Sequence, residues 1–107
     1  MGAIHDIRYE RLAREAPDVP LAMGAEDQDY LLRHLHAVGE AFDVRAVPDT
    51  PLAAMSGRSL ARHLARLRSW LDPQTLDQQL ALGRLESVFR LVASAVRLSQ
   101  LNPRRSA

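Results

Sequence analysis

The residues of this chain best suited to bind a partner are the arginines between positions 58 and 68. All 14 basic residues of the chain are arginine, a side chain that stays charged and holds carboxylates or phosphates through paired hydrogen bonds. Three of the arginines recur at four-residue steps, so a helix would display them on one face. This basic face comprises Arg58, Arg62, Arg66 and Arg68. It is either a solvated helix surface or a site for an acidic partner.

DNA binding is one use to which the basic face is suited. Residues 50–68 have the layout of a helix-turn-helix, with a short helix, a Ser-Gly turn and a second helix. The second helix would place Ser59, Arg62 and Arg66 in a major groove and on phosphates. The first helix, at about 50–55, is short, and a plain helical hairpin fits the same pattern. Nucleic acid is therefore the second choice of partner, after another protein.

Patterns typical of catalysis or metal binding are missing. The sequence has no nucleophile elbow, no glycine-rich phosphate loop and no cysteine. His34 and His36 are two positions apart and point to different faces of a helix, and the pair His36 and Glu40 lacks a third metal ligand. The acidic cluster at 26–29 suits a helix start, where the dipole favours negative charge. We therefore expect a non-enzymatic protein without metal, cofactor or small-molecule ligand.

The elements that position these residues are predicted to be helices. Leucine, alanine and arginine dominate the chain and favour helix, whereas strand signals are nearly absent. At 107 residues the length suits one domain. The predicted fold is a small all-α bundle of three to four helices, at about 5–16, 26–43, 58–71 and 73–101.

Prolines and caps mark the expected boundaries. Thr50 is predicted to cap a short turn through Met55, and Asp72 to cap a last helix that begins at Pro73. Gly39, inside a predicted helix, indicates either a close contact or a weak helix end. The expected organisation is an N-terminal helix and loop, a helical bundle domain and a basic tail, at residues 1–24, 25–101 and 102–107.

The last predicted helix is apolar around most of its circumference. Its polar wedge is narrow, and a surface helix needs an apolar stripe of little more than about 100°. The helix must therefore lie at the centre of the bundle or be covered by another chain. The residues that we expect to contact a protein partner or a second copy are Val88, Leu91, Val92, Ala95 and Leu98.

Charge is divided unevenly along the chain. Residues 1–50 hold ten acidic residues against five arginines, a net charge of −5, and residues 51–107 hold nine arginines against three acidic residues, a net charge of +6. If the acidic segment 26–49 docks beside the basic face, the arginines are neutralised internally. If it docks elsewhere, the basic face is open to a partner.

Residues 72–100 resemble the C-terminal region of inner-rod subunits of type III secretion systems. The resemblance rests on Asp72-Pro73-Gln74-Thr75-Leu76, followed by Gln79, Leu82, Arg84, Leu85, Leu91, Val92, Ala93 and Leu98-Ser99-Gln100. Those subunits are similar in length, lack cysteine and pack a long C-terminal helix into a helical assembly. This chain differs in ending with Asn102-Pro103 and in its more regularly helical N-terminal half. The resemblance implies a bacterial secretion-apparatus subunit.

These patterns together predict a helical interaction or assembly protein that associates through its long C-terminal helix. No apolar run approaches the roughly 20 residues that span a bilayer. The N-terminus carries charge from Asp6 onward and lacks the apolar core of a signal peptide. We therefore expect a cytoplasmic protein, or one exported by a route that needs no signal peptide. The alternative function is a small DNA-binding transcriptional regulator that uses Arg58, Arg62 and Arg66.

Overall fold

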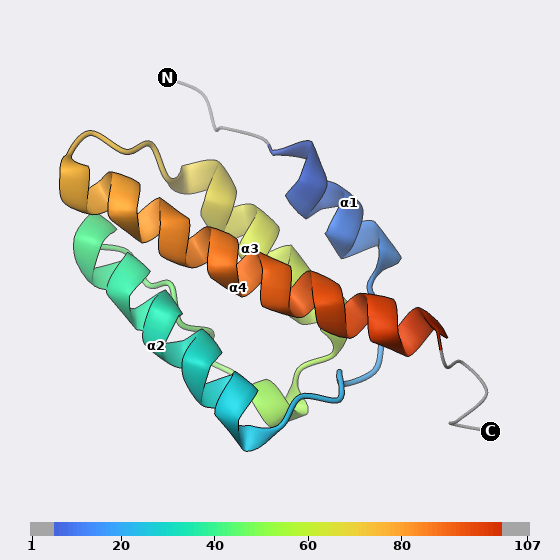
Figure 1. Cartoon of the computed structure of the whole chain (residues 1–107). Coiled ribbons are helices and arrows are strands. Elements are labelled where there is room, and N and C mark those ends of the chain that lie inside the picture. The colour runs from blue at the N-terminus through green and yellow to red at the C-terminus, as the bar shows by residue number, and fades with distance from the viewer. Residues whose placement is uncertain (1–5, 102–107) are drawn as a thin grey trace.

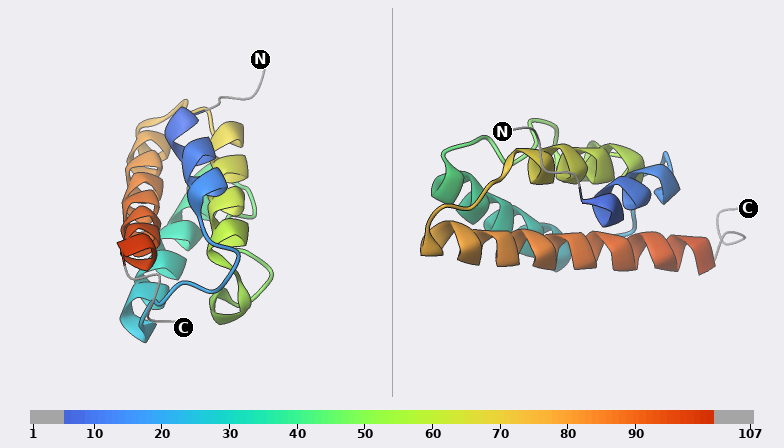
Figure 2. Two further views of the ribbon diagram at one scale, coloured as in Figure 1. Left: turned by 90° about the vertical axis from the view of Figure 1, so that its right-hand side faces the viewer. Right: turned by 90° about the horizontal axis from the view of Figure 1, so that it is seen from above.

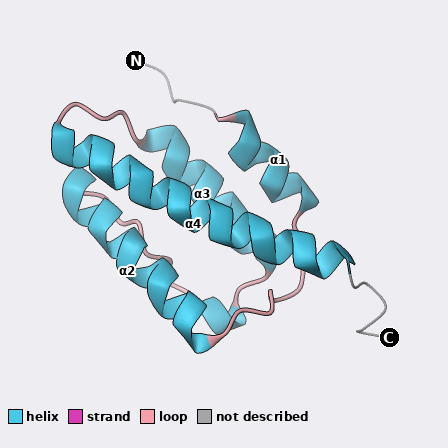
Figure 3. Ribbon diagram, in the orientation of Figure 1, coloured by secondary structure: helices cyan, strands magenta, loops and turns pink. Residues whose placement is uncertain are grey.

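The structure, a computed structural model, describes residues 6–101, and these form four α-helices and no β-strand (Figure 3). The helices are α1 (Ile7–Glu15), α2 (Ala25–Phe42), α3 (Gly57–Trp70) and α4 (Leu76–Leu101). The predicted small all-α bundle is thus confirmed. The expected basic tail, 102–107, lies outside the described residues. No helix in the described range is long and apolar enough to cross a membrane.

The start of α4 differs from the prediction. Asp72 and Pro73 belong to the connector, and the helix begins at Leu76. Thr75 Oγ1 accepts a hydrogen bond from the Gln78 backbone N–H at 3.1 Å, and Gln78 Oε1 accepts one from the Gln74 N–H at 2.7 Å. This reciprocal arrangement is close to a capping box, which satisfies free N–H groups at a helix start. The Thr-x-x-Gln pattern therefore sets the helix start.

The connector between α2 and α3 also departs from the prediction. Its only helical part is a 3-10 turn over Leu52–Ala54. Pro51, rather than Thr50, precedes this turn, and no side chain caps it. The stretch at 50–55 is therefore a single tight turn and not a short α-helix.

The N-terminus of α3 is closed by the loop that follows α1. Ser56 Oγ accepts a hydrogen bond from the Ser59 N–H at 3.0 Å. The Gly57 N–H donates to the Val19 carbonyl, and the Arg58 N–H donates to the Pro17 carbonyl, each at 2.8 Å. These bonds satisfy N–H groups that a helix start leaves free.

The four helices pack as two pairs. α1 packs chiefly on α3, and α2 packs chiefly on α4 (Figure 1). Within each pair the helices run in opposite directions, and α4 extends at its C-terminal end beyond α2 and α3 (Figure 2). Each pair joins one helix from the acidic half of the chain to one from the basic half. Both pairs therefore bring the acidic and the basic half of the chain together.

One hydrophobic core serves all four helices. α4 contributes its inner face, which consists of Ala81, Leu85, Val88, Val92 and Val96. α1 contributes Tyr9 and Leu12, which are 1% and 6% exposed. The core therefore includes α1, although the sequence-based division at residue 24 sets this helix apart from the bundle.

Arg8 fastens α1 to α4. Its Nη1 donates to Glu86 Oε2 at 2.7 Å and its Nη2 donates to Glu86 Oε1 at 3.0 Å, while Asp6 accepts from Nε and Nη2. The guanidinium carbon lies 5.3 Å from the centre of the Phe89 ring, which itself packs on Tyr9 with 4.3 Å between ring centres. A paired hydrogen-bond contact of this kind is stronger and more directional than a single-contact ion pair.

Gly39 is required by a close approach of the backbone. The chain turns back at Asp43, which has a left-handed φ of 54°, and the Val44 N–H bonds the Gly39 carbonyl. A Cβ at position 39 would lie 2.8 Å from the Val44 carbonyl oxygen. The close contact expected at this glycine is therefore present, where the connector leaves α2.

Candidate interaction surfaces

The five residues predicted to contact a partner through α4 occupy different environments. Val88 and Val92 are fully buried in the protein's own core, so they have no surface to offer. Leu91 and Ala95 are half-buried. Leu98 is 59% exposed near the end of α4. The prediction is therefore corrected for the two valines, which pack against the other helices of the same chain.

The opposite side of α4 carries an uncharged stripe that sequence reasoning missed. Four of its leucines are exposed by between 59% and 72%. Successive members are 4, 3, 4, 4, 3, 4 and 3 residues apart, so they lie on one side of a helix with 3.6 residues per turn. We call it the outer stripe, and its members are Leu76, Leu80, Gly83, Ser87, Leu91, Ser94, Leu98 and Leu101.

The signal for the outer stripe is present in the sequence. α4 has a second set of uncharged residues at three- and four-residue intervals, half a turn away from the set that forms the core. Only Leu91 and Leu98 of this set were among the predicted contact residues. The two sets together make α4 apolar around most of its circumference, and this general description does not separate the outer stripe from the core face.

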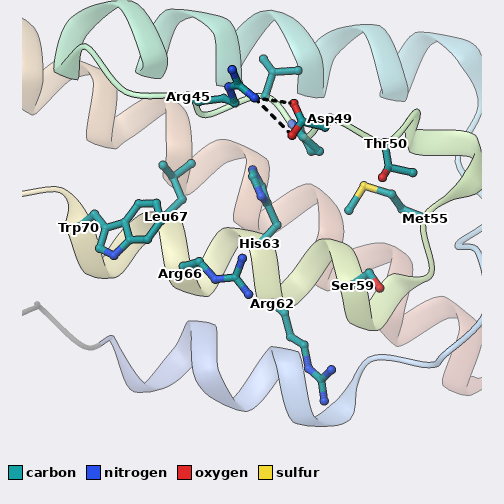
Figure 4. A pocket seen from close by; sticks show the side chains of 12 residues that line it. Arg45, Asp49, Thr50, Met55, Ser59, Arg62, His63, Arg66, Leu67 and Trp70 are labelled. Carbon is teal, nitrogen blue, oxygen red and sulfur yellow. Dashed lines mark hydrogen bonds and ion pairs between the residues drawn. The ribbon is translucent and has the colours of Figure 1, made fainter.

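Two arginines of the basic face line a groove of about 610 Å³ between α3 and the connector that follows α2 (Figure 4). From α3 come Arg62, Arg66 and the indole of Trp70, which is 62% exposed. From the connector come Arg45 and Asp49, which form an ion pair at 3.0 Å with each other. The groove thus combines cationic groups with an exposed aromatic ring.

The arginines of the basic face divide into two kinds. Arg58 lies 4.0 Å from Asp18, and Arg68 Nη1 donates to the Leu71 carbonyl at 3.2 Å. The side chains of Arg62 and Arg66 make no ion pair or hydrogen bond with any residue of the described range 6–101. α2 docks on α4 rather than beside these arginines. The end of the acidic segment 26–49 does line the groove, but its Asp49 pairs with Arg45, so the segment gives Arg62 and Arg66 no ion-pair partner.

The helix-turn-helix layout is not formed. Its first helix is replaced by the three-residue 3-10 turn. The start of α3 is covered, because Leu21 and Pro17 pack within 3.2 Å of the position that a Cβ on Gly57 would take. A recognition helix presents its N-terminal residues to the bases, and here the chain itself occupies that place.

The histidines serve local contacts. His63 Nε2 donates to the Ala46 carbonyl at 2.6 Å and so ties α3 to the connector. His34 Nδ1 lies 3.0 Å from the Tyr30 carbonyl and its ring stacks on Tyr30. His36 and Glu40 are 3.4 Å apart on the surface of α2. Within residues 6–101 no group of three potential metal ligands comes together.

The shifted pKa values belong to the joint between α1 and α4. Hydrogen bonds from Arg8 lower the pKa of Asp6, and the bonds to Asp6 and Glu86 raise the pKa of Arg8. Burial raises the pKa of the Tyr9 hydroxyl, and the nearby Glu86 adds to this effect. These shifts have a structural cause, because Arg8 and Tyr9 of α1 both contact Glu86 of α4, and Asp6 bonds Arg8.

Comparisons with protein-family models, with curated proteins and with solved structures found no match for this chain.

Proposed function

We propose that this chain is a non-enzymatic interaction protein that associates with another helix through the outer stripe of α4. The observation that supports the proposal is the outer stripe, whose eight uncharged positions follow one side of a 26-residue helix and include four exposed leucines. A surface helix of a monomer normally carries charged and polar residues on its outward side. Large exposed apolar patches mark interaction sites.

The proposal includes assembly into a larger structure. A secretion-apparatus subunit is one such assembly protein, and the resemblance of residues 72–100 to inner-rod subunits favours it. The exposed leucines at both ends of α4, Leu76 and Leu80 at one end and Leu98 and Leu101 at the other, would then contact neighbouring helices.

The test compares the full chain with its Leu98→Arg variant. Each protein is immobilised and exposed to an extract of the cells that produce it, and its mass in solution is measured by light scattering. We expect the variant to lose a bound protein or a higher mass that the wild type shows, while its helical circular dichroism is unchanged. The proposal is wrong if association of every kind is equal for the two proteins.

A second candidate function is binding of DNA through the middle of α3. The observation that favours it is the pair of uncompensated arginines, Arg62 and Arg66, beside the exposed ring of Trp70. Contacts to phosphates release counterions, so affinity for a labelled duplex should fall steeply with salt. Arg62→Ala with Arg66→Ala should weaken binding, and Arg33→Ala on α2 is the matched control. Absence of binding at low salt rejects this candidate.

A further inference from the structure

The order of residue types along the outer stripe is nearly the same from either end of α4. Two leucines stand at each end, at positions 76 and 80 and at positions 98 and 101. Gly83 and Ser94 are the next members inward, and Ser87 and Leu91 are the central pair. The two residues of each matched pair lie at nearly equal distances along the chain from residue 89. A single antiparallel alignment of two α4 helices therefore brings all four pairs together. This symmetry is a property that a two-fold dimer uses, because the same surface then faces itself.

Building on the proposed function, we propose that the occupant of the outer stripe is a second copy of this chain, docked with its α4 antiparallel to the first. Leu80 then contacts Leu98 of the second copy, and Leu76 contacts its Leu101. The two-fold axis passes near residue 89. The exposed ends of α4 cover each other, and no exposed leucine of the stripe is left without an apolar neighbour.

The middle of the stripe suits a close approach of two helices. Gly83 has no atom within 4 Å of the position that a Cβ would take, and it would face Ser94 of the second copy. Ser87 Oγ already donates to the Gly83 carbonyl at 3.2 Å. Its hydroxyl therefore enters the interface with its donor satisfied, and burial of a bonded polar group costs little.

One pair of charges beside the stripe, Glu86 and Arg90, is complementary under the same symmetry. Glu86 and Arg90 lie on one flank of the outer stripe, and in the antiparallel arrangement this flank faces itself. Arg90, which is 76% exposed and only 4.0 Å from its own Glu86, lies opposite Glu86 of the second copy. The same flank also carries Arg97, and the other flank carries Asp77 and Arg84. In this alignment Arg97 lies level with Leu80 of the second copy, and Asp77 lies level with its Leu101.

The two ends of this face of α4 are open. Figure 1 shows α4 in front from end to end, with α2 beside it and α1 and α3 behind. The exposed fractions agree, because Leu76, Leu80, Leu98 and Leu101 are each at least 59% exposed. At the centre of the stripe, the half-buried Ser87 and Leu91 line a hollow with residues 26–33 of α2, so a second α4 would lie beside the start of α2 there. Two helices bury a small interface, so we expect dissociation on the order of micromolar.

The first experiment measures mass against concentration by light scattering or sedimentation. The wild type should rise from the monomer mass of 11.9 kDa toward twice that value. Leu80→Glu combined with Leu98→Glu should raise the dissociation constant at least about 100-fold, because four carboxylates then enter an apolar contact. Gln79→Glu adds one carboxylate per chain one position off the stripe and should leave dimerisation unchanged. Circular dichroism checks that every variant is folded.

The second experiment determines the orientation. The chain has no cysteine, so Leu80→Cys and Leu98→Cys each introduce a unique thiol. Each variant is oxidised alone, and then the two are mixed and oxidised together. Disulfides need Cα atoms within about 7 Å, so the antiparallel arrangement predicts cross-linked dimers in the mixture and few in either variant alone. Cross-links within either single variant would overturn this arrangement.

The outcomes separate this inference from the proposed function. A wild type that stays monomeric at millimolar concentration overturns self-pairing, but capture of another protein that depends on Leu98 would still support the proposed function. A dimer that survives Leu80→Glu with Leu98→Glu places the self-contact elsewhere and overturns this inference, and the proposed function is also overturned if no other protein binds in a way that depends on Leu98. A dimer that is lost in this variant, retained in Gln79→Glu and cross-linked only in the mixture supports both.

Discussion

The inner and outer faces of α4 are both apolar, yet only one of them forms the core. The inner face carries Ala81, Leu85 and three valines, each at most 3% exposed. The outer stripe carries two leucines at each end and glycine, serine and the half-buried Leu91 between them, and its four end leucines are at least 59% exposed. The difference teaches that apolar character alone does not place a helix face. The matching stripe on α2, with Leu31, Leu35 and Val38, selects the inner face.

The pairing of the helices also explains why Arg62 and Arg66 have no acidic partner among the described residues. α2 packs along α4, and α1 packs along α3 and uses Arg8 to reach α4. The acidic helix α2 is thereby directed away from the groove that holds Arg62 and Arg66. The face of α3 toward the connector keeps a charge excess, whereas α4 keeps an apolar excess. The two exposed surfaces therefore suit partners of different chemistry.

The largest expected difference between the two faces is in stability. Leu85→Ala on the inner face should lower the free energy of unfolding by about 2–5 kcal/mol, since it leaves a cavity in a fully buried site. Leu98→Ala on the outer stripe should lower it by about 0.5 kcal/mol or less. Urea unfolding at a concentration where the chain is monomeric measures both. Equal losses would contradict the assignment of the two faces.

A smaller effect is expected at the edge between the faces, where Arg8 holds Glu86. Arg8→Ala should lower the free energy of unfolding by about 1 kcal/mol, because the paired hydrogen bonds are lost but both groups are partly exposed to water. Arg90→Ala removes the 4.0 Å contact to the same carboxylate and is the matched control, with an effect near zero. The same urea titrations report both values. If Arg90→Ala lowers the free energy of unfolding as much as Arg8→Ala does, the contact of Arg8 with Glu86 does not hold α1 on α4.

Gly83 and Gly39 differ in the space around the position that a Cβ would take. Gly83→Ala should raise the free energy of unfolding of the monomer by about 0.5–1 kcal/mol, because alanine favours helix and its Cβ meets nothing. Gly39→Ala should lower it, because the new Cβ would lie 2.8 Å from the Val44 carbonyl. Thermal unfolding of both variants tests the signs. A stabilised Gly39→Ala variant would show that the connector yields at this contact.

The smallest effect is a pH dependence at the start of α1. Hydrogen bonds from Arg8 lower the pKa of Asp6 below its ordinary value of 3.8. A carboxylate whose pKa is lower in the folded protein stabilises the fold above its unfolded pKa, and this contribution is lost as pH falls through the folded pKa. Asp6→Asn keeps a cap for α1 but removes the charge. Its stability deficit should be constant above pH 5 and should shrink below pH 4.

The fold class and the core faces of α2 and α3 follow from the sequence, because the apolar spacing along 26–43 and 58–71 is regular. The start of α4 does not follow, because two caps compete within four residues. Asp72-Pro73 has the familiar cap pattern, but the hydrogen bonds form between Thr75 and Gln78. The local sequence alone does not decide which of the two caps is used, because the start of α4 also depends on where this helix meets α2.

The candidate surfaces were predictable only in part. Leu98 and the basic face were recognised from residue type, but the burial of Val88 and Val92 depends on how α4 is rotated against α2. The distinction between Arg58 and Arg62 depends on the path of the loop that carries Asp18. Both are tertiary facts, set by contacts between segments that are distant in the chain.

The pairing of α1 with α3 and of α2 with α4 has a consequence for how the chain folds. No helix packs chiefly on its neighbour in sequence, so each pair closes a long loop before its contacts form. Folding should therefore be slower than in an up-and-down bundle and should proceed in one cooperative step. A cut in the connector between α2 and α3 would give two fragments of opposite charge. Neither fragment could complete a pair alone, and each would need the other to fold.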